Sequence, residues 1–165
     1  MTQPVPQSGP QFARVIRLDE SDLNVFETPG EIGEWAISGA FEFSDWTETH
    51  LTGKARQAFA NGWLGLESFG RSTFVAVAPI TEAEIATLTR ALAQHFVDHY
   101  GAPALEAALP VAEREIVNMQ EMCEDHSPNT LMVVERVLED VGVREKFRII
   151  KPRDAGLEAF AVHGT

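Results

Sequence analysis

Cysteine is nearly absent from this chain of 165 residues, and its one thiol, Cys123, has no partner for an internal disulfide. We therefore expect a protein of a reducing compartment, the cytoplasm. Cations are also scarce, with 13 Lys and Arg against 25 Asp and Glu, and the net charge of −12 repels nucleic-acid phosphates. No apolar run approaches the roughly 20 residues that cross a bilayer. The composition thus argues against nucleic acid and membranes as partners.

The first residues have neither the basic segment nor the apolar segment of a secretory signal. Residues 1–11 are rich in proline and glutamine, and we expect them to form a flexible N-terminal tail. The rest, residues 12–165, has the length of one domain, because roughly 100–200 residues suffice to bury a core without disulfides. Hydrophobic residues at 44% and charged residues at 23% are typical of a globular protein.

Alternation of apolar and polar residues, which is typical of half-buried strands, is clearest in residues 12–18. Turn residues such as glycine separate the segments that follow, and a glycine-assisted hairpin is expected around Phe69-Gly70. The other strands expected in this part of the chain are residues 24–27, 34–43, 64–68 and 71–78.

Helical spacing of apolar residues predicts two long helices joined by a short loop, which should therefore lie antiparallel. Thr81 and Glu84 have the spacing of a capping box and begin a helix that ends near Tyr100. The second long helix is expected over residues 110–125, and a shorter one over residues 54–60. The stripe of the first long helix is Ile85, Leu88, Leu92, His95 and His99.

The last part of the chain is expected to return to strands. Residues 130–138 and 143–150 are predicted to form a β-hairpin, and residues 157–162 to add an edge strand. Strands, then a helical pair, then strands predict an α+β fold. In that fold an antiparallel β-sheet packs against the helical pair as a single two-layer domain.

Cations gather in the second arm of the predicted hairpin, where Arg144, Lys146 and Arg148 share one face by their period-two spacing. Such a row could bind an anion or an acidic partner. We favour cross-strand ion pairs instead, because pairing in the hairpin places Glu139 opposite Arg144 and Glu135 opposite Arg148.

His95 and His99 are the sharpest candidates for a site, since four-residue spacing on a helix puts both imidazoles on one face. A zinc or iron ion would need a third ligand, and antiparallel helices would bring Glu113 or Glu115 to the histidines. Cys123 lies ten helical residues beyond Glu113, about 15 Å, and is too far for that site. The alternative is two histidines packed at the helix boundary, each bonded to a carbonyl or an acid.

Three segments carry a resemblance to a known family: Leu51-Thr52-Gly53-Lys54-Ala55-Arg56, Leu66-Glu67-Ser68-Phe69-Gly70 and residues 131–153. On these segments the chain resembles a family of small bacterial proteins catalogued only as a domain of unknown function. The likeness spans residues 12–153. The resemblance implies no activity and no catalytic residues, because none is assigned to the family.

No nucleophile elbow and no spaced pair of acids points to catalysis. We therefore expect a non-catalytic binding or accessory protein with a protein partner or self-association as a homodimer, and with the tryptophans Trp35, Trp46 and Trp63 as interface anchors. Two alternatives remain open. One is a metal-dependent enzyme or metal-binding protein that uses His95 and His99. The other is a domain that binds a small molecule in an apolar pocket.

Overall fold

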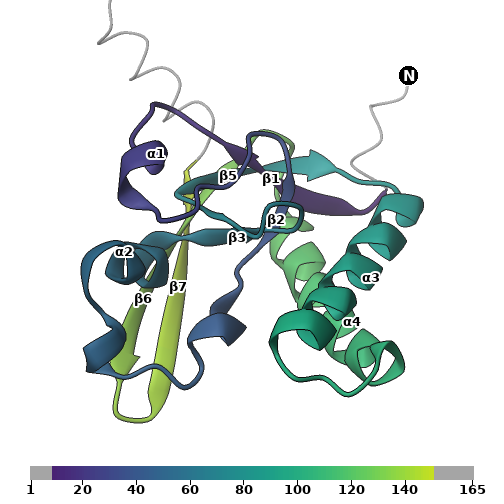
Figure 1. Ribbon diagram of the computed structural model, residues 1–165. Helices are drawn as coiled ribbons and strands as arrows, with labels where there is room; N and C mark the ends of the chain where they lie inside the picture. Colours follow the sequence, from purple (N-terminus) through teal and green to yellow (C-terminus); the bar gives the residue numbers. More distant parts are fainter. Residues whose placement is uncertain (1–8, 151–165) are drawn as a thin grey trace, which may run out of the picture.

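The computed structural model describes residues 9–150, which form one α+β domain (Figure 1). Residues 1–8 of the expected tail and the expected strand at residues 157–162 lie outside the described residues, whereas Gln11, the last residue of the expected tail, is buried and begins the first strand. The elements are β1 (Gln11–Ile16), α1 (Asp22–Val25), β2 (Trp35–Ile37), η1 (Ala40–Phe43), η2 (Glu48–His50), α2 (Gly53–Asn61), β3 (Trp63–Gly65), β4 (Arg71–Ser72), β5 (Phe74–Pro79), α3 (Glu82–His99), α4 (Leu105–Cys123), β6 (Leu131–Glu139) and β7 (Gly142–Ile150).

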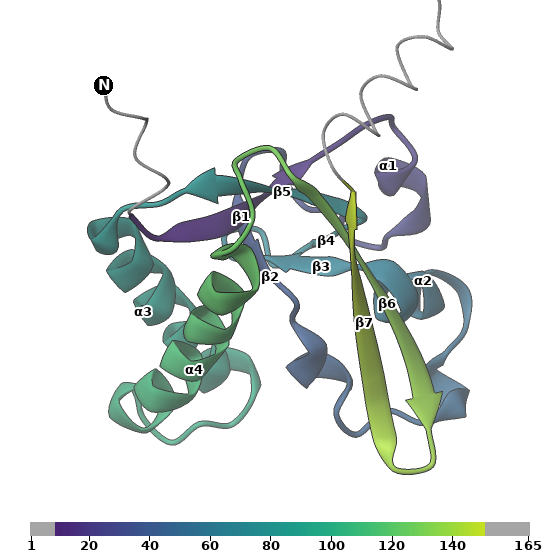
Figure 2. The same cartoon turned by 180° about the vertical axis from the view of Figure 1, so that it is seen from behind.

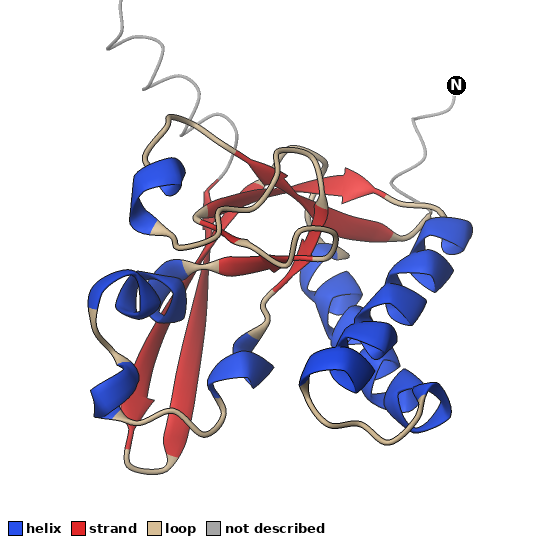
Figure 3. Ribbon diagram, in the orientation of Figure 1, coloured by secondary structure: helices blue, strands red, loops and turns tan. Residues whose placement is uncertain are grey.

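Seven strands form one antiparallel sheet in the order β4-β3-β2-β1-β5-β6-β7. The sheet twists strongly, so that β6 and β7 run nearly across the direction of β1 and β5 (Figure 2). As a result the two ends of the sheet approach each other: the rings of Trp63 on β3 and Phe147 on β7 are 5.7 Å apart. Helix α2 packs on β6, and the pair α3 and α4 packs beside β1 and β2 (Figure 3).

The capping box predicted at the start of α3 is confirmed. The Thr81 hydroxyl accepts from the Glu84 backbone amide, and the Glu84 carboxylate accepts from the Thr81 amide. The antiparallel α3–α4 pair is also confirmed, but α4 begins at Leu105 and not at Pro110. Pro110 therefore sits inside the helix and removes one of its hydrogen bonds. Burial of Ala108 and packing of Leu105 on the core accompany the extra turn.

The N-terminal half departs from the predicted strands in two places. Residues 22–25 form the short helix α1 instead of a strand, and the Asp22 carboxylate is buried, accepting from the Thr73 amide and hydroxyl. The strand expected over residues 34–43 ends at Ile37, because Gly39 adopts a left-handed conformation with φ of 72°. A Cβ at Gly39 would lie 2.5 Å from the Leu64 Cβ, so the chain turns there into η1.

The predicted hairpin is confirmed as β6 and β7, and so are its two ion pairs. Arg144 lies 2.7 Å from Glu139, and Arg148 lies 3.1 Å from Glu135. The register differs from the prediction by two residues, because Glu139 is opposite Gly142 in the sheet. The pairs are therefore diagonal neighbours, which long side chains can bridge.

Two of the three tryptophans are not surface anchors. Trp63 is fully buried and Trp35 is 9% exposed, with its ring against Phe12 and under the Arg14 guanidinium. Only Trp46 keeps a partly exposed ring. None of the helices formed by residues 9–150 is long and apolar enough to cross a membrane.

Candidate functional site

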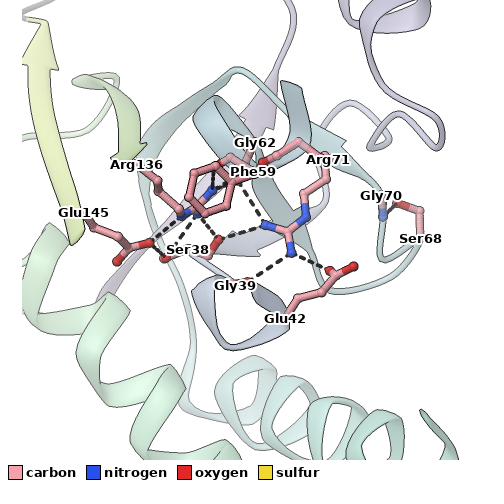
Figure 4. Close-up of polar contacts among 11 residues, drawn as sticks. Ser38, Gly39, Glu42, Phe59, Gly62, Ser68, Gly70, Arg71, Arg136 and Glu145 are labelled. Atoms are coloured by element: carbon pink, nitrogen blue, oxygen red, sulfur yellow. Dashed lines mark hydrogen bonds and ion pairs between the residues drawn. The ribbon is translucent and has the colours of Figure 1, made fainter. Parts of the chain in front are cut away.

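Two buried arginines meet at the centre of the molecule (Figure 4). Arg71 comes from β4 and Arg136 from β6, and each is at most 5% exposed. Both guanidinium groups donate to the same two carbonyl oxygens: Arg71 Nη1 to Ser38 (3.2 Å) and Gly62 (3.0 Å), and Arg136 Nη2 and Nη1 to Ser38 (2.6 Å) and Gly62 (3.0 Å). The arginines thus join the end of β2, the end of α2 and the two ends of the sheet.

Each arginine has its own carboxylate, and the two carboxylates lie at opposite ends of the pair. Arg71 Nη2 is 2.6 Å from Glu42 Oε1, and Arg136 Nε is 2.7 Å from Glu145 Oε2. The Phe43 ring lies under both guanidinium groups, at 4.6 and 5.2 Å from its centroid. Burial lowers the pKa of both arginines, that of Arg136 to about 10, so Arg136 remains charged near neutral pH.

A buried glutamate holds the turn between β3 and β4, residues 66–70. The Glu34 carboxylate accepts from the backbone amides of Glu67 and Ser68, both at 2.8 Å, and from the Ser68 hydroxyl at 2.6 Å. A Cβ at Gly65 would lie 2.2 Å from the Glu34 carboxyl carbon, so only glycine leaves room for this carboxylate. The turn is longer than the Phe69-Gly70 turn of the sequence prediction because it wraps around Glu34.

This turn fixes Phe69 in a left-handed conformation with φ of 56°, which is strained for a residue with a side chain. Its ring stacks parallel on His95, with centroids 3.8 Å apart. Phe69 also lines a cleft of about 350 Å³ between the turn, η1 and α2, which we name the Phe69 cleft. Its lining residues are Phe26, Glu27, Thr28, Glu42, Phe43, Trp46, Lys54, Ala55, Ala58, Phe69 and Arg71.

His95 and His99 are brought together, with ring centroids 4.7 Å apart, and His95 also contacts Tyr100. Burial and the neighbouring His99 lower the pKa of His95, while Glu42 opposes the shift, so His95 is neutral near pH 7. Burial, with Glu42 nearby, raises the pKa of Tyr100 to about 12. The histidines therefore belong to an aromatic cluster beside the Phe69 cleft.

Glu113, the predicted third metal ligand, lies elsewhere. It lines a groove beside the first turns of α3, with Glu82 and Ile85 among its neighbours. The early start of α4 explains this displacement, because eight residues from Leu105 to Glu113 carry the carboxylate about 12 Å along the helix. Among residues 9–150 no group of three or more His, Cys, Asp or Glu side chains is arranged to hold a metal ion. The zinc or iron site stays a prediction from the sequence.

A second hollow of about 300 Å³ lies beside the Arg136 end of the pair, between η1, α4 and β7. Glu115 and Glu145 both line it, together with apolar side chains such as Phe41 and Met122. Burial and the nearby Glu145 charge raise the pKa of Glu115. Burial in this hollow thus disfavours the ionised form of Glu115.

Replacing Glu115 with glutamine is expected to raise the urea midpoint of unfolding modestly at about pH 8. The folded pKa of Glu115 exceeds its unfolded value, so ionised Glu115 weakens the fold as pH rises through the folded pKa. Below the unfolded pKa the carboxyl is neutral in both states, and the advantage of Glu115→Gln should vanish at about pH 4. Glu121→Gln, at an exposed position of the same helix, is the control. An equal gain at both pH values would contradict this explanation.

Cys123 occupies the core, as its place in the helical stripe predicts, and is fully buried. Burial raises the pKa of its thiol to about 12, so the thiolate is scarce at neutral pH. A nucleophilic role for this cysteine therefore has no support in its surroundings.

Comparison with known proteins places the chain in a family without assigning it a function. Neither curated proteins nor solved structures give a significant match. A family of unknown function, DUF6505, matches residues 10–165, which is nearly the whole chain. The resemblance that the sequence suggested is thereby confirmed, and the protein belongs to the DUF6505 family.

Proposed function

We propose that this protein is a binding protein for a small planar aromatic molecule, which it holds in the Phe69 cleft. The strained backbone of Phe69 carries this proposal. Strain in a non-glycine residue persists only where the surroundings enforce it, and it is concentrated at functional sites. Here the buried Glu34 enforces it and directs an aromatic ring to the wall of a cleft.

The walls of the cleft suit a flat ring. Trp46 and Phe69 provide aromatic surface over the buried Phe43, and Glu42 and Lys54 provide polar groups that could orient a bound molecule. Pockets for small molecules generally combine mostly apolar walls with a few polar groups.

Two of the three segments that carry the family resemblance support the same location. Lys54 and Ala55 belong to residues 51–56, and Phe69 belongs to residues 66–70. Residues 131–153 contribute Arg136, which braces Arg71 behind the cleft. Segments far apart in the sequence therefore converge on one place.

The charged side chains that line the cleft restrict the class of molecule that it can bind. The lining contains two acids, Glu27 and Glu42, and two cations, Lys54 and Arg71. With a net charge of −12 on the protein, a polyanion such as a nucleic acid is disfavoured. Binding of a small molecule replaces our first expectation of an accessory protein, because the burial of Trp35 and Trp63 removes two of the interface anchors on which that expectation depended. A cytoplasmic location stays a prediction, as does self-association.

Phe69→Gly is expected to weaken binding of aromatic fragments at least about tenfold, as measured by isothermal titration calorimetry. Glycine accepts the left-handed backbone of this turn without strain, so the fold is retained while the ring is lost. Phe69→Tyr keeps the ring and should bind within about twofold of the wild type.

Val141→Ala is the matched control, because Val141 is 94% exposed at the tip of the β6–β7 hairpin, away from the cleft lining. Equal fragment affinities for Phe69→Gly and the wild type would contradict the proposed site.

A further inference from the structure

We infer that the ligand of the Phe69 cleft is an aromatic zwitterion, which carries one cationic amine and one carboxylate beside its ring. This inference rests on the proposed function and concerns the chemical class of the molecule. It follows from how the four charged side chains of the lining are paired.

Two of these charges are already satisfied by each other. Glu42 Oε1 accepts from Arg71 Nη2 at 2.6 Å, and the two Nη groups also donate to the carbonyl oxygens of Ser38, Gly39 and Gly62. Arg71 is only 5% exposed, so it forms the floor of the cleft and its side chain is not free to move with a ligand. Glu42 keeps its Oε2 for a further donor, in a side chain that is 40% exposed.

The remaining charges, Glu27 and Lys54, are exposed and have opposite sign. Within residues 9–150 neither has an ion-pair partner within 4.0 Å, so they are not paired with each other across the cleft. Glu27 follows α1, whereas Lys54 lies in the first turn of α2, so the two charges come from separate elements of the wall.

A ligand with one charge of each sign would satisfy both side chains at once. Its carboxylate would meet Lys54, and its amine would meet Glu27 and the free oxygen of Glu42. Its ring would lie between Trp46 and Phe69. A ligand with a single charge would leave one of the two exposed side chains without a partner, and an uncharged ligand would leave both.

Four compounds with the same indole ring test this inference by calorimetry on the full chain: L-tryptophan, tryptamine, 3-(indol-3-yl)propionate and 3-methylindole. L-tryptophan should bind most tightly, with a loss of about fivefold for each charge removed. Lys54→Met should weaken L-tryptophan and indolepropionate but leave tryptamine unchanged. Glu27→Gln should weaken L-tryptophan and tryptamine but leave indolepropionate unchanged. Lys146→Met, an exposed lysine on β7, should change none of the four affinities.

The outcomes separate this inference from the proposed function. If 3-methylindole binds as tightly as L-tryptophan, the inference is overturned and aromatic binding stands. If L-tryptophan fails to bind while tryptamine, indolepropionate or 3-methylindole binds in the cleft, the inference is overturned as well. If no aromatic compound binds, the proposed function and the inference both fail.

Discussion

Arg136→Met is expected to lower the free energy of unfolding by about 4 kcal/mol, measured by urea denaturation with circular dichroism. The Arg136 side chain is fully buried and donates to Phe59, Gly62 and Ser38 as well as to Glu145. Methionine fills much of the same volume but satisfies none of these acceptors. The variant therefore leaves the Glu145 carboxylate without its cation and leaves the carbonyl groups of Phe59, Gly62 and Ser38 with one donor fewer each, which is the costly way to break a buried ion pair.

Two further variants distinguish lost pairing from lost packing. Arg144→Met removes an arginine whose side chain is 70% exposed and paired with Glu139, and it should cost less than about 1 kcal/mol. Arg136→Met with Glu145→Met removes both charges and should recover part of the loss, because no unpaired carboxylate remains. A stability of Arg136→Met within about 1 kcal/mol of the wild type would show that the buried pair does not organise the fold.

Arg71→Lys is expected to cost about 3 kcal/mol, although it preserves the charge. One guanidinium reaches four acceptors here, Ser38, Gly39, Gly62 and Glu42, whereas a lysine ammonium has three donors at a single point. Each bond lost at a buried acceptor costs on the order of 1 kcal/mol. Urea denaturation at neutral pH measures the change.

The same variant should loosen the Phe69 cleft, because Arg71 forms its floor and holds Glu42. Aromatic fragments should therefore bind less tightly to Arg71→Lys than to the wild type, even where the variant is fully folded. Arg56→Lys, at an exposed position of α2, is the control and should alter neither property. Wild-type stability in Arg71→Lys would contradict the assigned role of the guanidinium.

Local signals in the sequence predicted the elements that depend on local physics. The capping box at Thr81 and Glu84 predicted the start of α3, and alternation predicted the β6–β7 hairpin with its ion pairs. The predicted start of α4 was wrong. Pro110 suggested the first turn of a helix, whereas the residues before it are good helix formers that pack on the core.

The buried arginine pair could not be found by spacing. Arg71 and Arg136 bond to Ser38, which precedes them by 33 and 98 residues, and their acceptors are mostly backbone carbonyls that leave no sequence signature. One signal was present for Arg136. It lies two positions from Val134 and from Leu138, so the three side chains share the inward face of the strand. Such a position calls for a buried partner.

The Phe69 cleft was partly predictable. The sequence predicted a glycine-assisted turn at Phe69-Gly70, and the turn exists. The carboxylate that shapes it, Glu34, lies more than 30 residues earlier, and its burial depends on the pairing of β2 with β3. Only tertiary structure brings these residues together.

The most direct test of aromatic binding in the Phe69 cleft is a ¹H–¹⁵N correlation spectrum of the labelled protein, titrated with a library of aromatic fragments. We expect the backbone amide shifts caused by binding to gather at Trp46, Ala55, Phe69 and Arg71. Shifts confined to the groove between α3 and α4, around Ile85 and Val117, or no shifts with any fragment, would contradict the proposal.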